Sequence, residues 1–186
     1  MKQHTAEQAL ALSNEHAADR AKAVRELGQS LAHDATLSKK PEVIEELRGY
    51  AAEGETARDA LAAMAALPGP VGSDLLYEVW TRTAKRTPLT ELAEALNYAK
   101  DVRPRASPAL GVALDLRRAD TCPAVKSILP RAKQYGDKRA LVPLVKLMSK
   151  HGCGPTKRDD CFECLGKRDE VRDAITAVRA RKEPKY

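Results

Sequence analysis

Aromatic side chains are scarce in this chain, which has one Phe, one Trp and five Tyr among 186 residues. Sandwiches of β-strands depend on aromatic and β-branched residues in alternating patterns. Here that alternation is nearly absent, whereas Ala, Leu and Val recur at the three- and four-residue steps typical of helices. The composition therefore argues against an aromatic-rich β-sandwich and favours closely packed helices.

Long apolar runs are also missing. No stretch reaches the roughly 18 apolar residues that a membrane-spanning helix needs. The N-terminal string MKQHTAEQALALSNEH lacks the apolar core and the cleavage site of a signal peptide. Apolar residues nevertheless make up 43% of the chain, which is too many for a disordered protein. We expect a folded chain without a transmembrane segment.

Catalytic motifs are absent as well. The four histidines, His4, His16, His33 and His151, are scattered, and no metalloprotease, nucleophile-elbow or phosphate-loop string occurs. The carboxylates of Asp159-Asp160 look like solvated loop charges. We therefore expect a chain that is not an enzyme and that holds no cofactor other than, at most, a structural zinc ion.

The apolar spacing predicts about nine or ten helices joined by short turns that contain Pro, Gly or Asp. The first segment, 5–33, is expected as one helix or as two helices with a break at Ser13-Asn14. The other expected helices are 41–54, 56–67, 73–85, 87–99, 107–116, 121–135, 137–151 and 169–181.

Several of these helices have clear start signals. Thr87, Ser107 and Thr121 each precede a proline at or near the first helical position, and Asp137 follows a glycine. Such side chains accept hydrogen bonds from the first free N–H groups of a helix, and proline has no N–H to leave unpaired there. Pro143 falls inside a periodic stretch, where we expect a kink.

Short connections place successive helices antiparallel, and one helical hairpin cannot bury both of its faces. The favoured architecture is therefore an α-solenoid of HEAT-like hairpins, with an irregular helical bundle as the alternative. We expect a single all-α domain over 1–186. The Pro68-Gly69-Pro70 turn marks a possible sub-boundary near 67–72, between the N-terminal helices of 1–67 and a C-terminal stack of 73–183.

Charge is divided unequally along the chain. The first 100 residues carry a net charge of −3 and the remainder carries +9, which gives the total of +6. A basic helical face could follow a phosphate backbone, but aromatic residues for base stacking and a recognition-helix motif are missing. Nucleic acid is therefore a possible partner that we do not favour. The tentative binding surface comprises Arg103, Arg105, Arg117, Arg118, Arg131, Lys138 and Arg139.

All four cysteines, Cys122, Cys153, Cys161 and Cys164, lie in the last 65 residues. Cys122 opens one expected helix, and Cys153 follows the end of the antiparallel return helix. Cys161 and Cys164 come after a short loop that cannot leave that end of the hairpin. We therefore expect the four thiols to converge at one end of one helical hairpin.

Two chemistries fit such a cluster, disulfides and a zinc site, and four unlinked thiols buried as small hydrophobic side chains are the alternative to both. Two disulfides would have three possible pairings, of which Cys161 with Cys164 is structurally the least favourable, and would indicate a periplasmic or other extracytoplasmic location. A structural zinc site would use the four cysteines, with His151 as a spare ligand, and would suit the cytoplasm, as would free thiols. A thiol redox sensor that uses Cys161 or Cys164 is a further alternative.

The C-terminal two thirds of the chain, about 55–183, resembles a HEAT-like helical region of uncharacterised myxobacterial proteins. Some serine/threonine protein kinases carry this region C-terminally. The matching strings are ALPGPVGSDLLYEVW (66–80), ASPALGVALDLRRADTC (106–122), GDKRALVPL (136–144), HGCG (151–154) and DCFECL (160–165).

The resemblance implies an accessory region rather than an enzyme, since the kinase motifs are absent. It also implies a setting outside the cytoplasm, after a membrane anchor, where oxidised cysteines are natural. We expect a non-enzymatic protein–protein interaction or accessory module, excised from a larger signalling or envelope protein, with an unknown protein partner.

Overall fold

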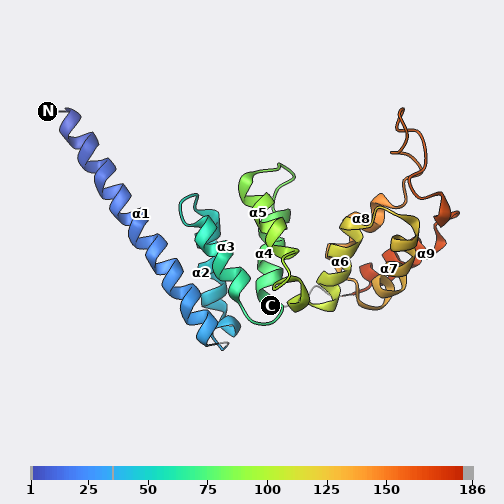
Figure 1. Cartoon of the computed structure of the whole chain (residues 1–186), viewed down its shortest axis with the longest axis horizontal. Coiled ribbons are helices and arrows are strands. Elements are labelled where there is room, and N and C mark those ends of the chain that lie inside the picture. The colour runs from blue at the N-terminus through green and yellow to red at the C-terminus, as the bar shows by residue number, and fades with distance from the viewer. Residues whose placement is uncertain (1, 35, 182–186) are drawn as a thin grey trace. The chain divides into compact units, whose positions relative to one another are not determined.

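The computed structural model describes residues 2–34 and 36–181, with side chains from residue 16 onward except at 17 and 32. Within these residues the chain forms nine α-helices, four short 3-10 turns and one isolated β-bridge, without a β-strand (Figure 1). The predicted all-α class is therefore confirmed, whereas the solenoid arrangement stays a prediction. None of the described helices is both long and apolar enough to cross a lipid bilayer.

The chain divides into two compact units, Met1–Arg105 and Ala106–Tyr186. The possible sub-boundary near 67–72 falls inside unit 1, between two helices that pack on each other. The Pro68-Gly69-Pro70 turn thus separates two helices of one core.

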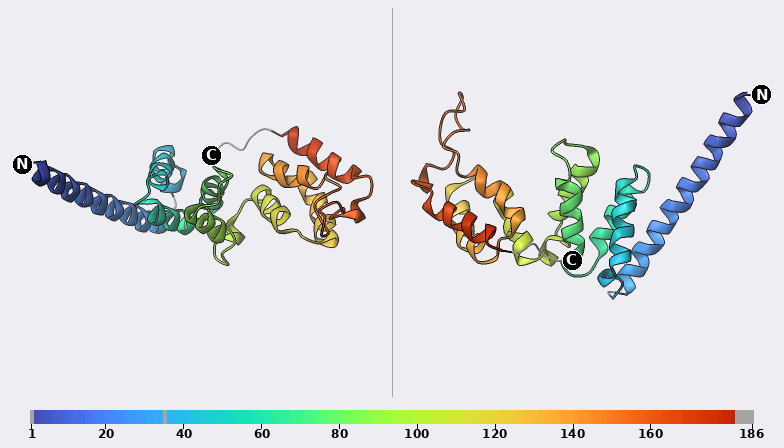
Figure 2. Two further views of the ribbon diagram at one scale, coloured as in Figure 1. Left: turned by 90° about the horizontal axis from the view of Figure 1, so that it is seen from above. Right: turned by 180° about the vertical axis from the view of Figure 1, so that it is seen from behind.

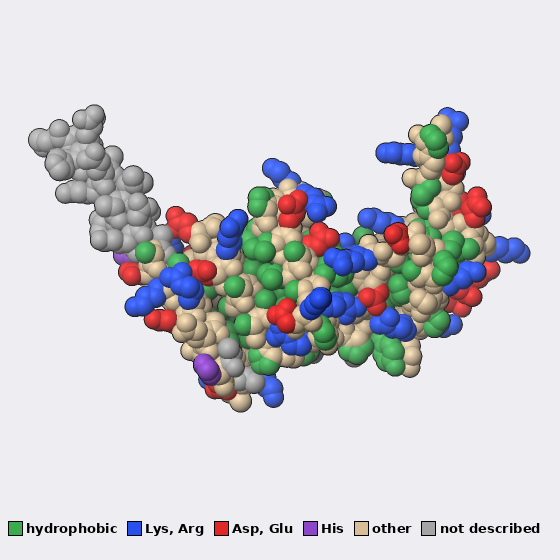
Figure 3. Space-filling view, viewed as in Figure 1, with side chains coloured by type: hydrophobic (Ala, Val, Ile, Leu, Met, Phe, Trp, Pro, Cys, Tyr) green, Lys and Arg blue, Asp and Glu red, His purple; other side chains and the backbone are tan. Residues whose placement is uncertain are grey.

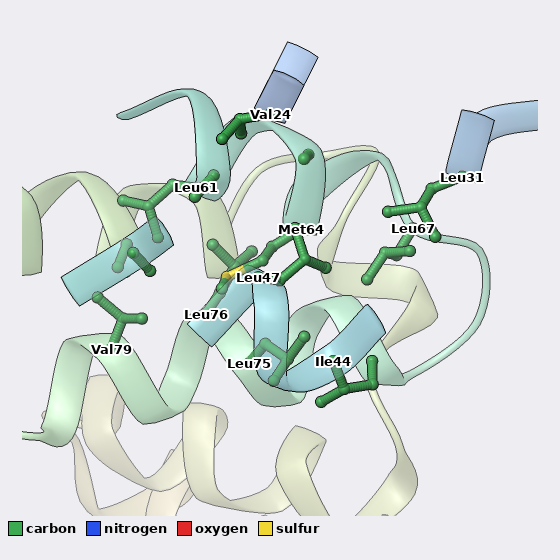
Figure 4. Packing of buried hydrophobic residues seen from close by; sticks show 14 of the residues in the cluster. Val24, Leu31, Ile44, Leu47, Leu61, Met64, Leu67, Leu75, Leu76 and Val79 are labelled. Carbon is green, nitrogen blue, oxygen red and sulfur yellow. The ribbon is translucent and has the colours of Figure 1, made fainter. Parts of the chain in front are cut away.

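Unit 1 is built around one short central helix, α3, which contacts four other helices of the unit. The elements are α1 (Lys2–His33), η1 (Leu37–Lys39), α2 (Pro41–Ala52), α3 (Ala57–Ala66), α4 (Val71–Thr81), α5 (Pro88–Asn97) and η2 (Arg103–Arg105). Leu61 and Met64 of α3 are fully buried among Leu47 of α2 and Leu76 of α4 (Figure 4). Burial of such side chains contributes about 1.5–3 kcal/mol each.

Helix α1 continues without interruption through Ser13-Asn14, so of the two expected forms the single helix is observed and the break is not. Neither residue is a strong helix breaker, since both cost well under 1 kcal/mol relative to Ala. The described side chains that α1 contributes to the core, Val24, Leu27 and Leu31, all lie in its C-terminal third. The preceding turns extend beyond the other helices of unit 1 (Figures 1 and 2).

Unit 2 has a separate core, in which α7 packs against both α6 and α9. Its elements are α6 (Pro108–Arg118), α7 (Cys122–Tyr135), η3 (Lys138–Ala140), α8 (Leu141–Lys146), η4 (Glu163–Leu165) and α9 (Asp169–Arg179). The buried side chains include Val125 and Leu129 of α7 and Val171, Ala174 and Val178 of α9.

The predicted helix starts at Thr87, Ser107 and Thr121 are confirmed. Each side-chain oxygen accepts a hydrogen bond from the backbone N–H three residues later. Thr87 also takes part in a reciprocal capping box with Thr90. Asp137 accepts a bond from the N–H of Arg139, as expected, although it caps a 3-10 turn.

The expected helix over 137–151 is much shorter in the structure. A 3-10 turn comes first, α8 spans only Leu141–Lys146, and Pro143 lies in its first turn instead of kinking a longer helix. Proline suits this place because a first-turn N–H has no partner within the helix. The helix expected over 73–85 likewise ends earlier, at Thr81.

Candidate functional site

The four cysteines form two pairs at disulfide-bonding distance. The sulfur atoms of Cys122 and Cys164 are 2.02 Å apart, and those of Cys153 and Cys161 are 2.20 Å apart. The sequence left the pairing open apart from disfavouring Cys161 with Cys164, and the structure does not pair these two. Each pair instead takes one cysteine from the segment Cys161-Phe-Glu-Cys164, so the two pairs meet there. The helices that α7 contacts most are α6 and α9, and its contact with η4, not the expected hairpin with the return helix, places Cys122 beside this segment.

These pairs anchor a loop of residues 149–161, here called the cysteine-linked loop, which lies between α8 and η4. All of residues 149–159 are exposed to solvent. The loop folds back on itself through paired backbone hydrogen bonds between Cys153 and Asp159, 3.0 and 3.1 Å long. Figure 1 shows it projecting from the helices of unit 2.

Two glycines make this turn possible. Gly152 and Gly154 have φ angles of 130° and 73°, which side chains with a Cβ rarely adopt. A Cβ on Gly154 would lie 1.8 Å from the carboxylate of Asp159, an exposed side chain that can turn away, so the positive φ angle is the reason for glycine at this position. The string Gly-Cys-Gly therefore sets the shape of the loop.

A buried arginine joins the loop to the helices. Arg168 is only 2% exposed and donates hydrogen bonds to the carbonyls of Leu147 (2.8 Å), Ser149 (3.3 Å) and Gly166 (3.0 Å). Its guanidinium also forms an ion pair with both oxygens of Asp160, at 2.5 and 2.6 Å. Buried charges need such partners because an unpaired one is costly.

The interaction with Arg168 lowers the pKa of the Asp160 carboxyl below its ordinary value, and a hydrogen bond from the Phe162 N–H acts in the same direction. Asp160 is therefore a structural anion, which corrects its assignment as a solvated loop charge. Sequence inspection missed this pair. Arg168 precedes an acidic helix start and has no neighbouring signal of burial.

Several side chains of the tentative basic surface form hydrogen bonds or ion pairs within their own unit. Arg105 of unit 1 donates to the carbonyls of Ala65 and Leu67 at the end of α3. Arg131 of unit 2 pairs with Asp115 at 2.9 Å.

Arg139 is largely buried, pairs with Asp137 at 2.5 Å and contacts the Ser107 hydroxyl at 3.4 Å. These guanidinium groups stabilise local structure, so they cannot simultaneously offer all their donors to a phosphate backbone.

The remaining members of the tentative surface are placed as follows. Arg103 is half-buried in η2 of unit 1. In unit 2, Arg117 is half-buried and Arg118 exposed at the end of α6, and Lys138 is exposed in η3. Since Arg103 and Arg105 belong to one unit and the other five residues to the second, the structure does not define the seven as one surface.

The cysteine-linked loop carries two basic side chains that, unlike those above, are not engaged within the residues that the structure describes. Lys157 and Arg158 are exposed at its tip and have no ion-pair or hydrogen-bond partner for their side chains in the described part of the chain. The space-filling view shows Lys and Arg side chains on this projection (Figure 3). The signal was present in the sequence as a Lys-Arg pair after Gly-Pro-Thr, but nothing local distinguished it from the other basic pairs.

His151, the spare zinc ligand of the sequence prediction, lies beyond the end of α8, with Nδ1 3.1 Å from the carbonyl oxygen of Arg158. It therefore helps to close the loop. Among the described residues, no group of three or more His, Cys, Asp or Glu side chains is placed to hold a metal ion. The cysteine sulfurs are paired instead of converging on one point.

Comparison with known proteins adds no relative: no family model, curated protein or solved structure matches this chain. The proposals below therefore depend on the residues themselves.

Proposed function

We propose that this chain is a non-enzymatic helical accessory module that binds an acidic protein surface through the cysteine-linked loop. One observation carries the proposal: residues 149–159 are all exposed, yet the loop is tied down by two cysteine pairs and a buried arginine. None of these exposed residues contributes to the core, so core packing does not account for the anchoring.

The anchoring has a clear advantage for binding. Ordering a free loop on association costs about 0.5–1.5 kcal/mol for each immobilised side chain, and a loop held beforehand avoids much of that cost. Recognition residues are commonly placed on loops supported by a rigid scaffold. The unpaired cations Lys157 and Arg158 at the tip complement an acidic partner.

Two further considerations support this proposal. The resemblance to HEAT-like accessory regions points to the same class of protein, in which a helical scaffold presents a contact surface. The cysteine pairs suit an oxidising compartment, so we propose that the module works outside the cytoplasm, as part of a larger signalling or envelope protein.

Site-specific photo-crosslinking tests the proposal. A benzophenone amino acid replaces Thr156, an exposed residue of the loop tip, in the full chain expressed in its own cells. We expect a discrete adduct with an acidic protein. The adduct should fall at least about tenfold when Lys157→Glu and Arg158→Glu reverse the charge of the tip.

The matched control is Lys126→Glu with Arg179→Glu, which makes the same change of charge at exposed positions of α7 and α9. This variant should retain the adduct. The proposal is wrong if the adduct is absent, or if both double variants reduce it equally, because general electrostatic attraction would then suffice.

A further inference from the structure

The segment Cys161-Phe-Glu-Cys164 contributes one cysteine to each pair, and these two cysteines are only three residues apart. The N–H of Leu165 bonds to the carbonyl of Phe162 at 3.0 Å, and η4 begins at Glu163. Cys161 and Cys164 belong to different pairs. Reduction of either pair therefore leaves a free thiol on one of these two residues, three positions along the chain from a cysteine of the disulfide that remains. Cys161 with Cys164 is the least favourable pairing for a static structure, but cysteines at this spacing do form the disulfides of Cys-X-X-Cys redox motifs.

The two pairs differ in their surroundings. Cys153 lies within the exposed stretch 149–159, where every neighbour in sequence is accessible to solvent. Cys122, at the start of α7, and Cys161 are half-buried, whereas Cys164 is exposed. Each pair thus has one exposed and one half-buried cysteine, but only Cys153 lies in a run of eleven consecutive exposed residues, so we place the entry of an external dithiol at the Cys153–Cys161 pair.

Cys122 is also placed as a good leaving group. It is the first residue of the 14-residue helix α7, directly after the capping residue Thr121. The partial positive charge of a helix N-terminus stabilises a thiolate at this position. In thiol–disulfide exchange, the more stable thiolate departs faster.

We propose that the four cysteines form an internal thiol–disulfide relay, in which reduction of Cys153–Cys161 is passed on to Cys122. An external dithiol first reduces this pair and becomes a disulfide itself, which leaves thiols on Cys153 and Cys161. The Cys161 thiolate then attacks the Cys164 sulfur. The Cys161–Cys164 bond forms, the Cys122–Cys164 bond breaks, and the electron pair leaves on the Cys122 sulfur.

The net change consumes two electrons and two protons. Two disulfides become one, within Cys161-Phe-Glu-Cys164, and the free thiols are Cys122 and Cys153. The loop tip then loses its covalent link to Cys161, and η4 loses its covalent link to α7. Arg168 still binds the carbonyls of Leu147 and Ser149. The relay is a property of the isolated chain and does not depend on partner binding.

A two-stage reduction of the purified full chain tests the relay. One equivalent of a water-soluble phosphine opens one pair at about pH 3, where exchange is blocked because thiolates are absent. Cyanylation in acid and mass mapping then identify the free thiols. A second sample is first incubated at about pH 8 and then acidified and mapped. We expect cyanylated Cys153 and Cys161 before the incubation, and cyanylated Cys153 and Cys122 after it.

The double variant Cys122→Ala, Cys164→Ala is the matched control, because Cys161 has nothing to attack and should stay cyanylated at both stages. The relay is refuted if wild-type Cys161 also remains free after incubation at the higher pH. Initial cyanylation of Cys122 and Cys164 would overturn the assigned entry point. Since no partner is present, this result is separate from the crosslinking test.

Discussion

At the scale of single residues, three arginines act in the same way. Arg105, Arg168 and Arg181 each donate to backbone carbonyls at the C-terminal end of a helix elsewhere in its own unit, namely α3, α8 and α7. The last carbonyls of a helix have no intrahelical donor and carry partial negative charge. A guanidinium supplies both the missing hydrogen-bond donors and a compensating positive charge. These three basic side chains therefore stabilise helix ends within their own units.

The Asp160–Arg168 pair gives a pH-dependent prediction. Asp160→Asn should destabilise unit 2 at neutral pH, because the buried guanidinium loses its counter-charge. The pKa of Asp160 is lowered in the folded state, so the carboxylate contributes stability above its ordinary value of about 3.9. As the pH falls through the lowered pKa, that contribution disappears.

Urea unfolding of the wild type and the variant across this pH range measures the effect. The difference in unfolding free energy should be constant near neutrality and shrink below about pH 4. Glu163→Gln removes a charge from the same region without touching Arg168, and should change stability by less than about 0.5 kcal/mol. A difference that grows on acidification would contradict the prediction.

At the scale of elements, close helix contacts depend on residues without side chains. A Cβ on Gly72, near the start of α4, would lie 2.1 Å from the carbonyl oxygen of Met64 in α3. Gly28 of α1 faces Ala63 of α3, where a Cβ would lie 3.1 Å from the alanine Cβ. Such contacts allow α3 to serve as the centre of unit 1, because its neighbours approach almost to backbone contact.

Glycine substitutions test this packing. Gly72→Ala should destabilise the protein by about 2–3 kcal/mol, since backbone atoms must move to relieve the overlap. Gly49→Ala, in the exposed middle of α2 with nothing within 4 Å of the new Cβ, should instead stabilise it by about 0.5–1 kcal/mol. Thermal and urea unfolding distinguish the two, and equal effects would argue against the proposed close contact.

At the scale of the whole molecule, each unit has its own buried core. Both cysteine pairs lie in unit 2, where they close sequence separations of 42 and 8 residues. Loop-closure entropy gives about 4 and 2.5 kcal/mol for loops of these lengths. The stability of unit 2 should therefore depend on oxidation in a way that the stability of unit 1 does not.

Hydrogen exchange under oxidising and fully reducing conditions checks this expectation. Reduction should lower protection in α7 and α9, which surround Leu129 and Val171, and should leave α3 and α4 nearly unchanged. Separate cores make this local response the expected one. A uniform loss of protection over both units, or none in unit 2, would contradict it.

The amino-acid sequence by itself determined the all-α class, most helix starts and the clustering of the cysteines. Most of these features are local: Ser107 and Thr121 cap N–H groups three residues away, and Cys153, Cys161 and Cys164 lie within a stretch of twelve residues. Packing of η4 on α7 brings Cys122 to them. Tertiary structure decided the division at Arg105, the cysteine pairing and the burial of Arg168. These depend on contacts between distant residues, and no local spacing shows which carbonyls or sulfurs a side chain will meet.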